Sequence, residues 1–273
     1  MSKKTLFTVL TVLVVFMAVG TFYDLAISEA LYNEHNVIAV ITNSFAMVPS
    51  GIVMVYCAGI VNWFLKNTKL YIPSMLVPVA AGVLEWHEVG KWIGMNKFVW
   101  LALGVITGII VILLFKVIEP HVSKKQFIVA FIFLATATCL TANVELLKNI
   151  WGRRRYYSMD NPATQFTPWY IPHPGMEGDI FESFPSGHSS FACLLTFLIY
   201  LPEMVNVKLN KGVALGIAFT WVALVMFGRI CYGAHFLTDV SFGAIVGVIW
   251  CYVGQSCIQK AFSLREKSQT KTN

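Results

Sequence analysis

The sequence predicts an all-helical protein that crosses a membrane several times. Its mean hydropathy is +0.67, 57% of its residues are hydrophobic and only 12% are charged, which is too apolar for a soluble chain of 273 residues. A chain inside the hydrocarbon layer must satisfy its backbone polar groups as helices or as a closed barrel. The apolar runs here are long and lack the two-residue alternation of barrel strands, so helices are favoured. We therefore expect a polytopic transmembrane helical bundle that forms a single domain over residues 1–273.

Eight apolar stretches are the expected spans. The first is too long for the core of a signal peptide, so we expect it to be retained. The third is the weakest, because Pro73 and Pro78 interrupt it, and residues 37–47 fit a helix at the membrane interface. If the third and fourth stretches do not cross, six spans remain with the same polarity. The expected spans are residues 5–27, 48–65, 70–84, 98–118, 126–147, 187–201, 212–227 and 236–258.

The distribution of positive charge predicts the orientation. A cytoplasmic N-terminus places thirteen Lys and Arg residues inside and seven outside, as the positive-inside rule requires. We therefore expect both termini inside and residues 148–185 as a long loop outside, in a bacterial plasma (inner) membrane. The net charge of +6 then reflects topology, and the partner is the lipid bilayer rather than a nucleic acid. Five of the seven outer cations fall in polar clusters: Lys148, Arg153, Arg154, Arg155 and Arg229.

Residues typical of metal sites and disulfides give no strong signal. The six cysteines fall within or at the ends of apolar segments and form no CxxC pair, so packing is the favoured role. Glu85, His87 and Glu88 are close enough in sequence to suggest a metal site, but such a group is more typical of a solvated helix end. We expect no metal and no cofactor, and the sequence sets no oligomeric state.

Three polar clusters lie where apolar segments end. The last is Arg229-Ile-Cys-Tyr-Gly-Ala-His235-Phe-Leu-Thr-Asp239. His235 and Asp239 are four residues apart, so they share one face at the start of the final helix. A carboxylate there can accept the proton of one imidazole nitrogen and leave the other as a nucleophile or general base. By itself the pattern equally fits a buried His–Asp pair that only joins two helices.

The middle cluster is Pro185-Ser-Gly-His188, at an expected helix start. Ser186 is the expected N-cap, and backbone N–H groups at a helix start favour an anion, which Gly187 would allow to approach closely. His188 would lie in the first turn, where it could protonate a leaving oxygen. Alone, this cluster fits an ordinary helix start with an incidental histidine better.

The first cluster is Lys148-Asn-Ile-Trp-Gly-Arg-Arg-Arg155. Arginine offers a planar fork of donors to phosphate oxygens and lysine offers a point charge. The alternative is a basic run at the membrane surface. Against this alternative, the run lies on the side where positive charge is disfavoured.

Taken together, Lys148-x6-Arg155, Pro185-Ser-Gly-His188 and Arg229-x5-His235-x3-Asp239 resemble the three-part signature of the type 2 phosphatidic acid phosphatase (PAP2) superfamily. That superfamily includes lipid phosphatases, glucose-6-phosphatase and vanadium haloperoxidases. Order and spacing match over residues 148–239. The chain departs from the family pattern at Tyr156, where proline is usual, and at Gly228, where serine is usual. The first departure changes how the loop leaves the site, and the second deletes one hydroxyl donor to phosphate.

The resemblance implies a fold with a six-helix core and a mechanism. His235, oriented by Asp239, would attack phosphorus and form a phosphohistidine. His188 would protonate the leaving oxygen and then activate water. Positive charge and backbone N–H groups would stabilise the phosphoryl oxygens without a metal. The implied phosphate-binding residues are Lys148, Arg155, Ser186, Gly187 and Arg229.

A membrane lipid phosphate is the expected substrate, with its tail between helices and its head at the loop. Polyprenyl diphosphate, phosphatidylglycerol phosphate and phosphatidic acid all fit. The loop aromatics suit an interfacial position, as headgroup contacts or as simple membrane anchors. Asp160, Glu177, Asp179 and Glu182 would repel further negative charge if they face the site. A lipid phosphotransferase on the same scaffold is an open alternative. A transporter of an anionic substrate fits less well, because the ionisable residues gather at span ends.

Overall fold

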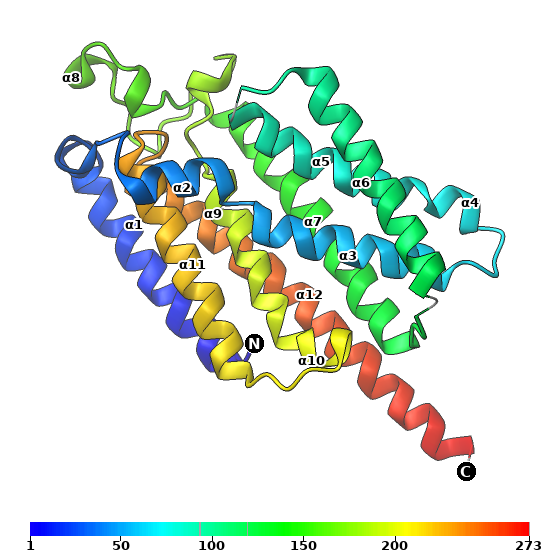
Figure 1. Cartoon of the computed structure of the whole chain (residues 1–273). Coiled ribbons are helices and arrows are strands. Elements are labelled where there is room, and N and C mark those ends of the chain that lie inside the picture. The colour runs from blue at the N-terminus through cyan, green and yellow to red at the C-terminus, as the bar shows by residue number, and fades with distance from the viewer. Residues whose placement is uncertain (93, 119, 273) are drawn as a thin grey trace. The chain divides into compact units, whose positions relative to one another are not determined.

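The computed structural model describes residues 1–92, 94–118 and 120–272, without the side chains of residues 88, 89, 91, 92 and 265–272. All regular structure in these residues is helical (Figure 1), which confirms the expected fold class. Seven helical segments in the described part are long and apolar enough to cross a membrane: Lys3–Leu31, Val37–Phe64, Lys97–Ile118, Lys124–Ser158, Gly187–Val205, Lys211–Cys231 and Leu237–Leu264.

The structure differs from the expected eight spans at residues 70–84. This stretch is divided into a short helix α4 (Tyr71–Ser74) and a longer helix α5 (Leu76–Trp92). Pro73 and Pro78 lack the backbone N–H that a continuous helix would need at these places. At 17 residues, α5 is at the lower limit of length for crossing a bilayer.

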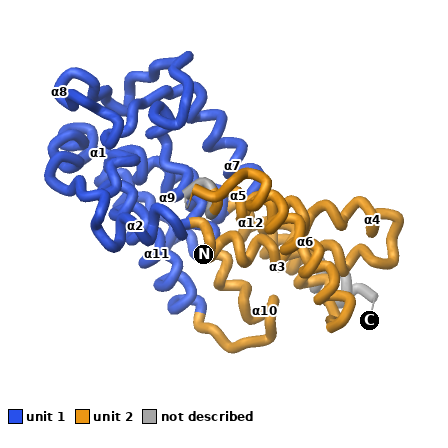
Figure 2. Tube along the Cα trace, turned by 45° about the horizontal axis from the view of Figure 1, so that its top comes forward, with its two compact units in different colours: residues 1–46, 137–196, 211–252 blue, residues 47–136, 197–210, 253–273 orange. Residues whose placement is uncertain are grey.

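The chain forms two compact units (Figure 2). Unit 1 comprises residues 1–46, 137–196 and 211–252, and unit 2 comprises residues 47–136, 197–210 and 253–273. Two long helices, α7 (Lys124–Trp151) and α12 (Leu237–Thr272), contribute residues to both units. The organisation as one domain stays a prediction.

Unit 1 holds the three polar clusters at the ends of its helices. Helix α1 (Lys3–Leu31), α7 and α11 (Lys211–Cys231) end close to where α9 (Gly187–Ala192) and α12 begin. Between these ends lie helix α2 (Val37–Phe45) and the loop with η1 (Tyr156–Ser158), α8 (Pro162–Gln165) and η2 (Asp179–Phe181). Polar residues therefore gather at one end of the unit, and apolar residues lie along its length.

Helix α1 shows how an apolar helix contributes to this end. Its exposed side chains include Phe7 and Phe22, as expected of a helix with one face toward lipid. The buried residues recur every three or four positions, on the opposite stripe, and the last two are polar. They are Leu13, Met17, Gly20, Asp24 and Ser28.

Unit 2 contains α3 (Val48–Phe64), α4, α5, α6 (Lys97–Ile118), the first half of α7, the end of η3 (Cys193–Tyr200), α10 (Leu201–Val205) and the last part of α12. Side-chain donors to backbone carbonyls connect its segments. The Gln126 amide donates to the Met204 carbonyl at 2.9 Å, and the Trp63 indole donates to the Pro120 carbonyl at 2.7 Å. The candidate site residues all lie in unit 1.

Candidate functional site

His235 lies in the short turn between α11 and α12. Gly233 has a φ of +75°, a conformation that favours glycine, and its N–H donates to the Ile230 carbonyl at 2.8 Å. The backbone N–H of His235 donates to the Arg229 carbonyl at 3.3 Å. The turn therefore folds back over the end of α11 and places His235 beside Arg229.

The His235 ring is buried and has a defined tautomer. Its Nδ1 lies 2.6 Å from the Ser183 carbonyl oxygen. Because a carbonyl only accepts, Nδ1 carries the proton and Nε2 keeps its lone pair. Burial, followed by the charges of Arg229, Arg155 and His188, holds the pKa of His235 well below its ordinary value of 6.5. The ring is therefore neutral near pH 7.

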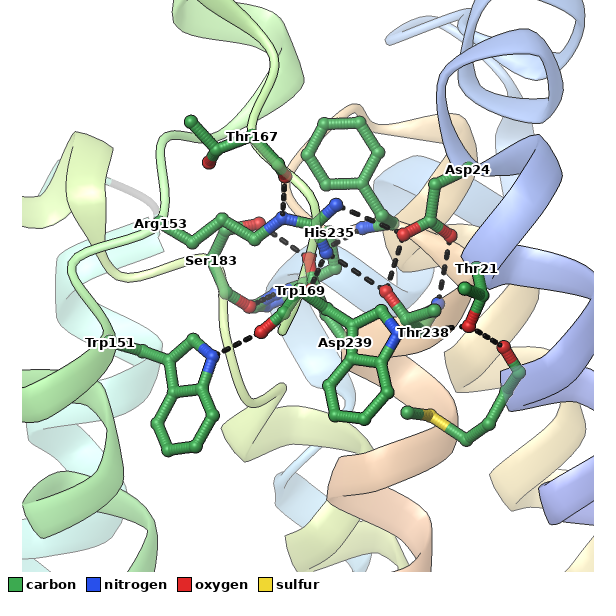
Figure 3. Close-up of polar contacts among 12 residues, drawn as sticks. Thr21, Asp24, Trp151, Arg153, Thr167, Trp169, Ser183, His235, Thr238 and Asp239 are labelled. Atoms are coloured by element: carbon green, nitrogen blue, oxygen red, sulfur yellow. Dashed lines mark hydrogen bonds and ion pairs between the residues drawn. The ribbon is translucent and has the colours of Figure 1, made fainter. Parts of the chain in front are cut away.

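Among the described residues, the Asp239 carboxylate makes no hydrogen bond to His235, contrary to the expectation from the sequence. It contacts other groups instead. One carboxylate oxygen accepts from the Ser183 hydroxyl at 2.6 Å and from the Phe236 N–H at 2.7 Å. Phe236 directly precedes α12, so the carboxylate turns back to satisfy a free N–H at the helix start instead of facing the ring. Ser183 connects the two residues, since its hydroxyl donates to Asp239 and its carbonyl accepts from His235 (Figure 3).

Arg153 belongs to the first cluster, but the sequence reasoning missed its central role. Its side chain is completely buried, and its guanidinium donates to Asp239 on α12 and to Asp24 on α1 (Figure 3). It also donates to the Thr238 hydroxyl and to the Thr167 carbonyl, each at 2.9 Å. A buried arginine between two carboxylates is charge-compensated, so Arg153 joins the loop to two helices rather than offering charge to a ligand.

Asp24 is the second residue that was missed. It is 3% exposed, and it accepts from the Thr238 N–H at 3.0 Å and from the Thr238 hydroxyl. The sequence does carry a signal for it, because an acidic residue inside an otherwise apolar span is costly unless it is paired.

Lys148 and Arg155 lie beside acidic residues of the loop. Lys148 Nζ is 3.3 Å from Glu182, and Arg155 Nη1 is 3.0 Å from Asp179. Arg155 Nη2 lies 4.0 Å from Glu182 as well. Asp179 and Glu182 therefore face the two cations that the sequence assigned to phosphate.

The middle cluster joins the other two. Ser186 is the N-cap of α9, as predicted, and accepts from the Ser189 N–H at 3.3 Å. Its own N–H donates to the Asp239 carbonyl at 3.0 Å. A Cβ placed on Gly187 would lie 3.7 Å from Lys148 Nζ, so Lys148 borders the start of α9. His188, in the first turn, is close enough to His235 to lower its pKa.

Arg229 completes the arrangement at the end of α11. Its side chain is fully buried and donates through Nη1 to the carboxamide oxygen of Asn43 on α2. The structure thus gathers the predicted residues of all three clusters and adds Asp24 and Asn43 from the first 46 residues.

The described residues contain no comparable group of metal-ligating side chains. Within the described part of the chain, no three His, Cys, Asp or Glu side chains are arranged to hold a metal ion. His87 packs edge-on against Trp100 with a centroid separation of 4.9 Å, and the side chain of Glu88 lies outside the described residues. All six cysteines are free thiols.

Comparison with known proteins identifies a family. A model of the PAP2 superfamily matches residues 126–263, more than half of the chain and inclusive of all three clusters. Searches of curated proteins and of solved structures found no match.

Proposed function

The chain belongs to the PAP2 superfamily and has the character of a membrane-embedded phosphatase, and on that premise we propose that it hydrolyses a lipid phosphate ester or diphosphate. The observation that carries the proposal is His235, a neutral buried imidazole with a free Nε2 lone pair, beside His188 and Arg229. A neutral imidazole among cations has the properties of a nucleophile toward an anionic phosphoryl group.

In the first step, His235 Nε2 attacks phosphorus in line and forms a P–N bond while the bond to the leaving oxygen breaks. His188 gives its proton to that oxygen. The Ser183 carbonyl holds the Nδ1 proton, and its acceptor dipole stabilises the positive charge that develops on the ring. Asp239 supports this geometry through Ser183 and the start of α12.

In the second step, His188 takes a proton from water, the water oxygen attacks phosphorus, and the P–N bond breaks. Inorganic phosphate leaves and His235 returns to its neutral form. Lys148, Arg155 and Arg229 offset the charge on the phosphoryl oxygens, a role that Mg²⁺ has in many phosphoryl-transfer enzymes. Because these side chains supply the positive charge, the proposed reaction needs no metal ion.

A lipid substrate is supported by the setting of the site. The candidate residues lie at the ends of apolar helices, where a headgroup would be when its tail is in the hydrocarbon layer. Tyr170 and Ile171 in the loop are exposed and suit contact with the interface. Other loop aromatics pack internally, since Phe166 and Tyr156 both contact the ring of Phe236. The distribution of Lys and Arg supports a site on the outer side of the membrane, and we propose that this membrane is a bacterial inner membrane.

The test is a panel of lipid phosphates with purified full-length protein in detergent. Polyprenyl diphosphate, phosphatidylglycerol phosphate and phosphatidic acid are scored for free phosphate, and the lipid products are separated by chromatography. Release of phosphate from at least one of them supports the proposal. Labelled phosphate found on a second lipid would instead identify a phosphotransferase, and no turnover of any lipid phosphate would overturn the proposal.

A further inference from the structure

Helix α2 lies outside the matched family segment, yet it packs along the end of α11 that carries Arg229. Asn36 caps α2 and accepts from the N–H groups of Ile38 and Ala39. The Trp221 indole donates to the Ala46 carbonyl at 3.2 Å, and the Asn33 N–H donates to the Cys231 carbonyl at 2.8 Å. The segment 33–46 is therefore fixed to α11 before and after Arg229.

The two helices come closest at Gly228. A Cβ built on Gly228 would overlap the Thr42 hydroxyl and lie 2.9 Å from the Ile38 carbonyl oxygen. The Thr42 hydroxyl is itself fixed, because it donates to that carbonyl at 2.7 Å. Position 228 therefore cannot accept the side chain of the usual serine without displacing α2. Thr42 occupies the space that a serine side chain would take.

Arg229 directly follows Gly228, and Asn43 directly follows Thr42. These two residues form a polar contact between the helices. Asn43 is 7% exposed, and its carboxamide oxygen accepts from Arg229 Nη1. An amide oxygen is a neutral acceptor, so it fixes one edge of the guanidinium without adding a negative charge.

We propose that Asn43 is a positioning residue of the phosphate site, which holds Arg229 through a neutral contact that itself adds no negative charge beside the guanidinium. This inference rests on the proposed function and deepens it. It also gives α2 a role: the helix that excludes a serine at position 228 supplies a polar side chain to the adjacent arginine.

Binding of orthovanadate to the full-length protein, measured by thermal shift in detergent, tests the inference alongside phosphate release. Asn43→Ala should weaken vanadate binding and kcat/KM by roughly tenfold to 100-fold, because the arginine loses its fixed geometry. Asn43→Asp should not restore either quantity, since a carboxylate would hold Arg229 but cancel its charge. Asn62→Ala is the matched control. Asn62 is also a buried helical asparagine, whose side chain donates to Ser74 at 2.9 Å, so its loss should lower stability and leave vanadate binding unchanged.

A double-mutant comparison separates positioning from general structure. In an Arg229→Ala background, Asn43→Ala should cause no further loss of vanadate affinity, because Asn43 acts through Arg229. Three outcomes would overturn the inference and leave the proposed function intact. They are wild-type vanadate affinity in Asn43→Ala, full rescue of that affinity by Asn43→Asp, and an additive loss of affinity in the double variant. Failure of the wild-type protein to bind vanadate or release phosphate would overturn both.

Discussion

Asp24 on α1 and Arg153 in the loop after α7 form a completely buried ion pair, with 3.0 Å between Oδ2 and Nη2. Their positions are 129 residues apart in the sequence. Asp239 contacts the same guanidinium, so one arginine joins the first helix, the loop and the last helix. Arg155 follows Arg153 by two residues in the same loop. The ion pair therefore helps to fix the position of Arg155, a candidate phosphate-binding residue.

Removal of one carboxylate should therefore destabilise the protein. Asp24→Asn leaves a buried arginine with incomplete compensation, which typically costs about 3–5 kcal/mol. The expected result is a large fall in the midpoint of thermal unfolding in detergent. Asp160→Asn is the control, because Asp160 is exposed and lies 4.0 Å from Arg154. Equal unfolding midpoints for the two variants would show that the buried pair does not hold the loop.

Replacement of the proposed nucleophile should abolish the chemistry and spare the fold. His235→Ala should release no phosphate above background, a loss of at least about a thousandfold. After quenching in alkaline detergent, which preserves the acid-labile P–N bond of a phosphohistidine, labelled substrate should leave no phosphoenzyme in this variant, whereas His188→Ala should retain some label because its second step is slowed. His35→Ala serves as the control, since that side chain is 90% exposed. Turnover by His235→Ala would remove the nucleophile assignment.

The loop carboxylates should compete with an anionic ligand. Glu182 lies near both Lys148 and Arg155, so Glu182→Gln removes a negative charge from the place where phosphoryl oxygens are proposed to bind. Inhibition by inorganic phosphate should become stronger, by roughly two- to fivefold, as expected for partly exposed charge pairs. Glu177→Gln, an exposed change in the same loop, should have no effect. Weaker inhibition in Glu182→Gln would indicate that Glu182 positions the cations instead.

The pH profile should reflect the environment of His235. Burial and the neighbouring cations lower the pKa of His235, so the neutral ring persists at pH values where an ordinary histidine is protonated. As pH falls, kcat/KM should therefore decline only below 6.5, through the lowered pKa of His235. Thermal unfolding at each pH separates titration from loss of fold, and the ionisation of the substrate is measured independently. An acid limb centred at or above pH 6.5 would contradict a neutral buried nucleophile.

The sequence predicted those features that depend on local pattern. Long apolar runs indicated the helices, because a membrane span needs continuous apolar length. The resemblance of the three clusters to the PAP2 signature indicated that His188, Arg229 and His235 share one site. Local pattern also identified Ser186 as a helix cap.

The features that the sequence did not predict depend on long-range packing or on competition between partners. Nothing near Asn43 in the sequence points to Arg229, 186 residues away. For Asp239, two roles competed: a residue four positions after a histidine at a helix start can orient the ring or satisfy the first backbone N–H. The structure shows the second role, because the Ser183 carbonyl already takes the ring proton.

Chelation should leave the proposed reaction intact. Lys148, Arg155 and Arg229 belong to the protein, so the positive charge assigned to the phosphoryl oxygens does not depend on a bound ion. Phosphate release after extensive EDTA treatment should stay within about twofold of the untreated rate, and added Mg²⁺ should not increase it. Orthovanadate should inhibit under the same conditions, which confirms that the site is intact. A large loss with EDTA, restored by a divalent cation, would show that charge at the phosphoryl group comes from a metal in addition to these side chains.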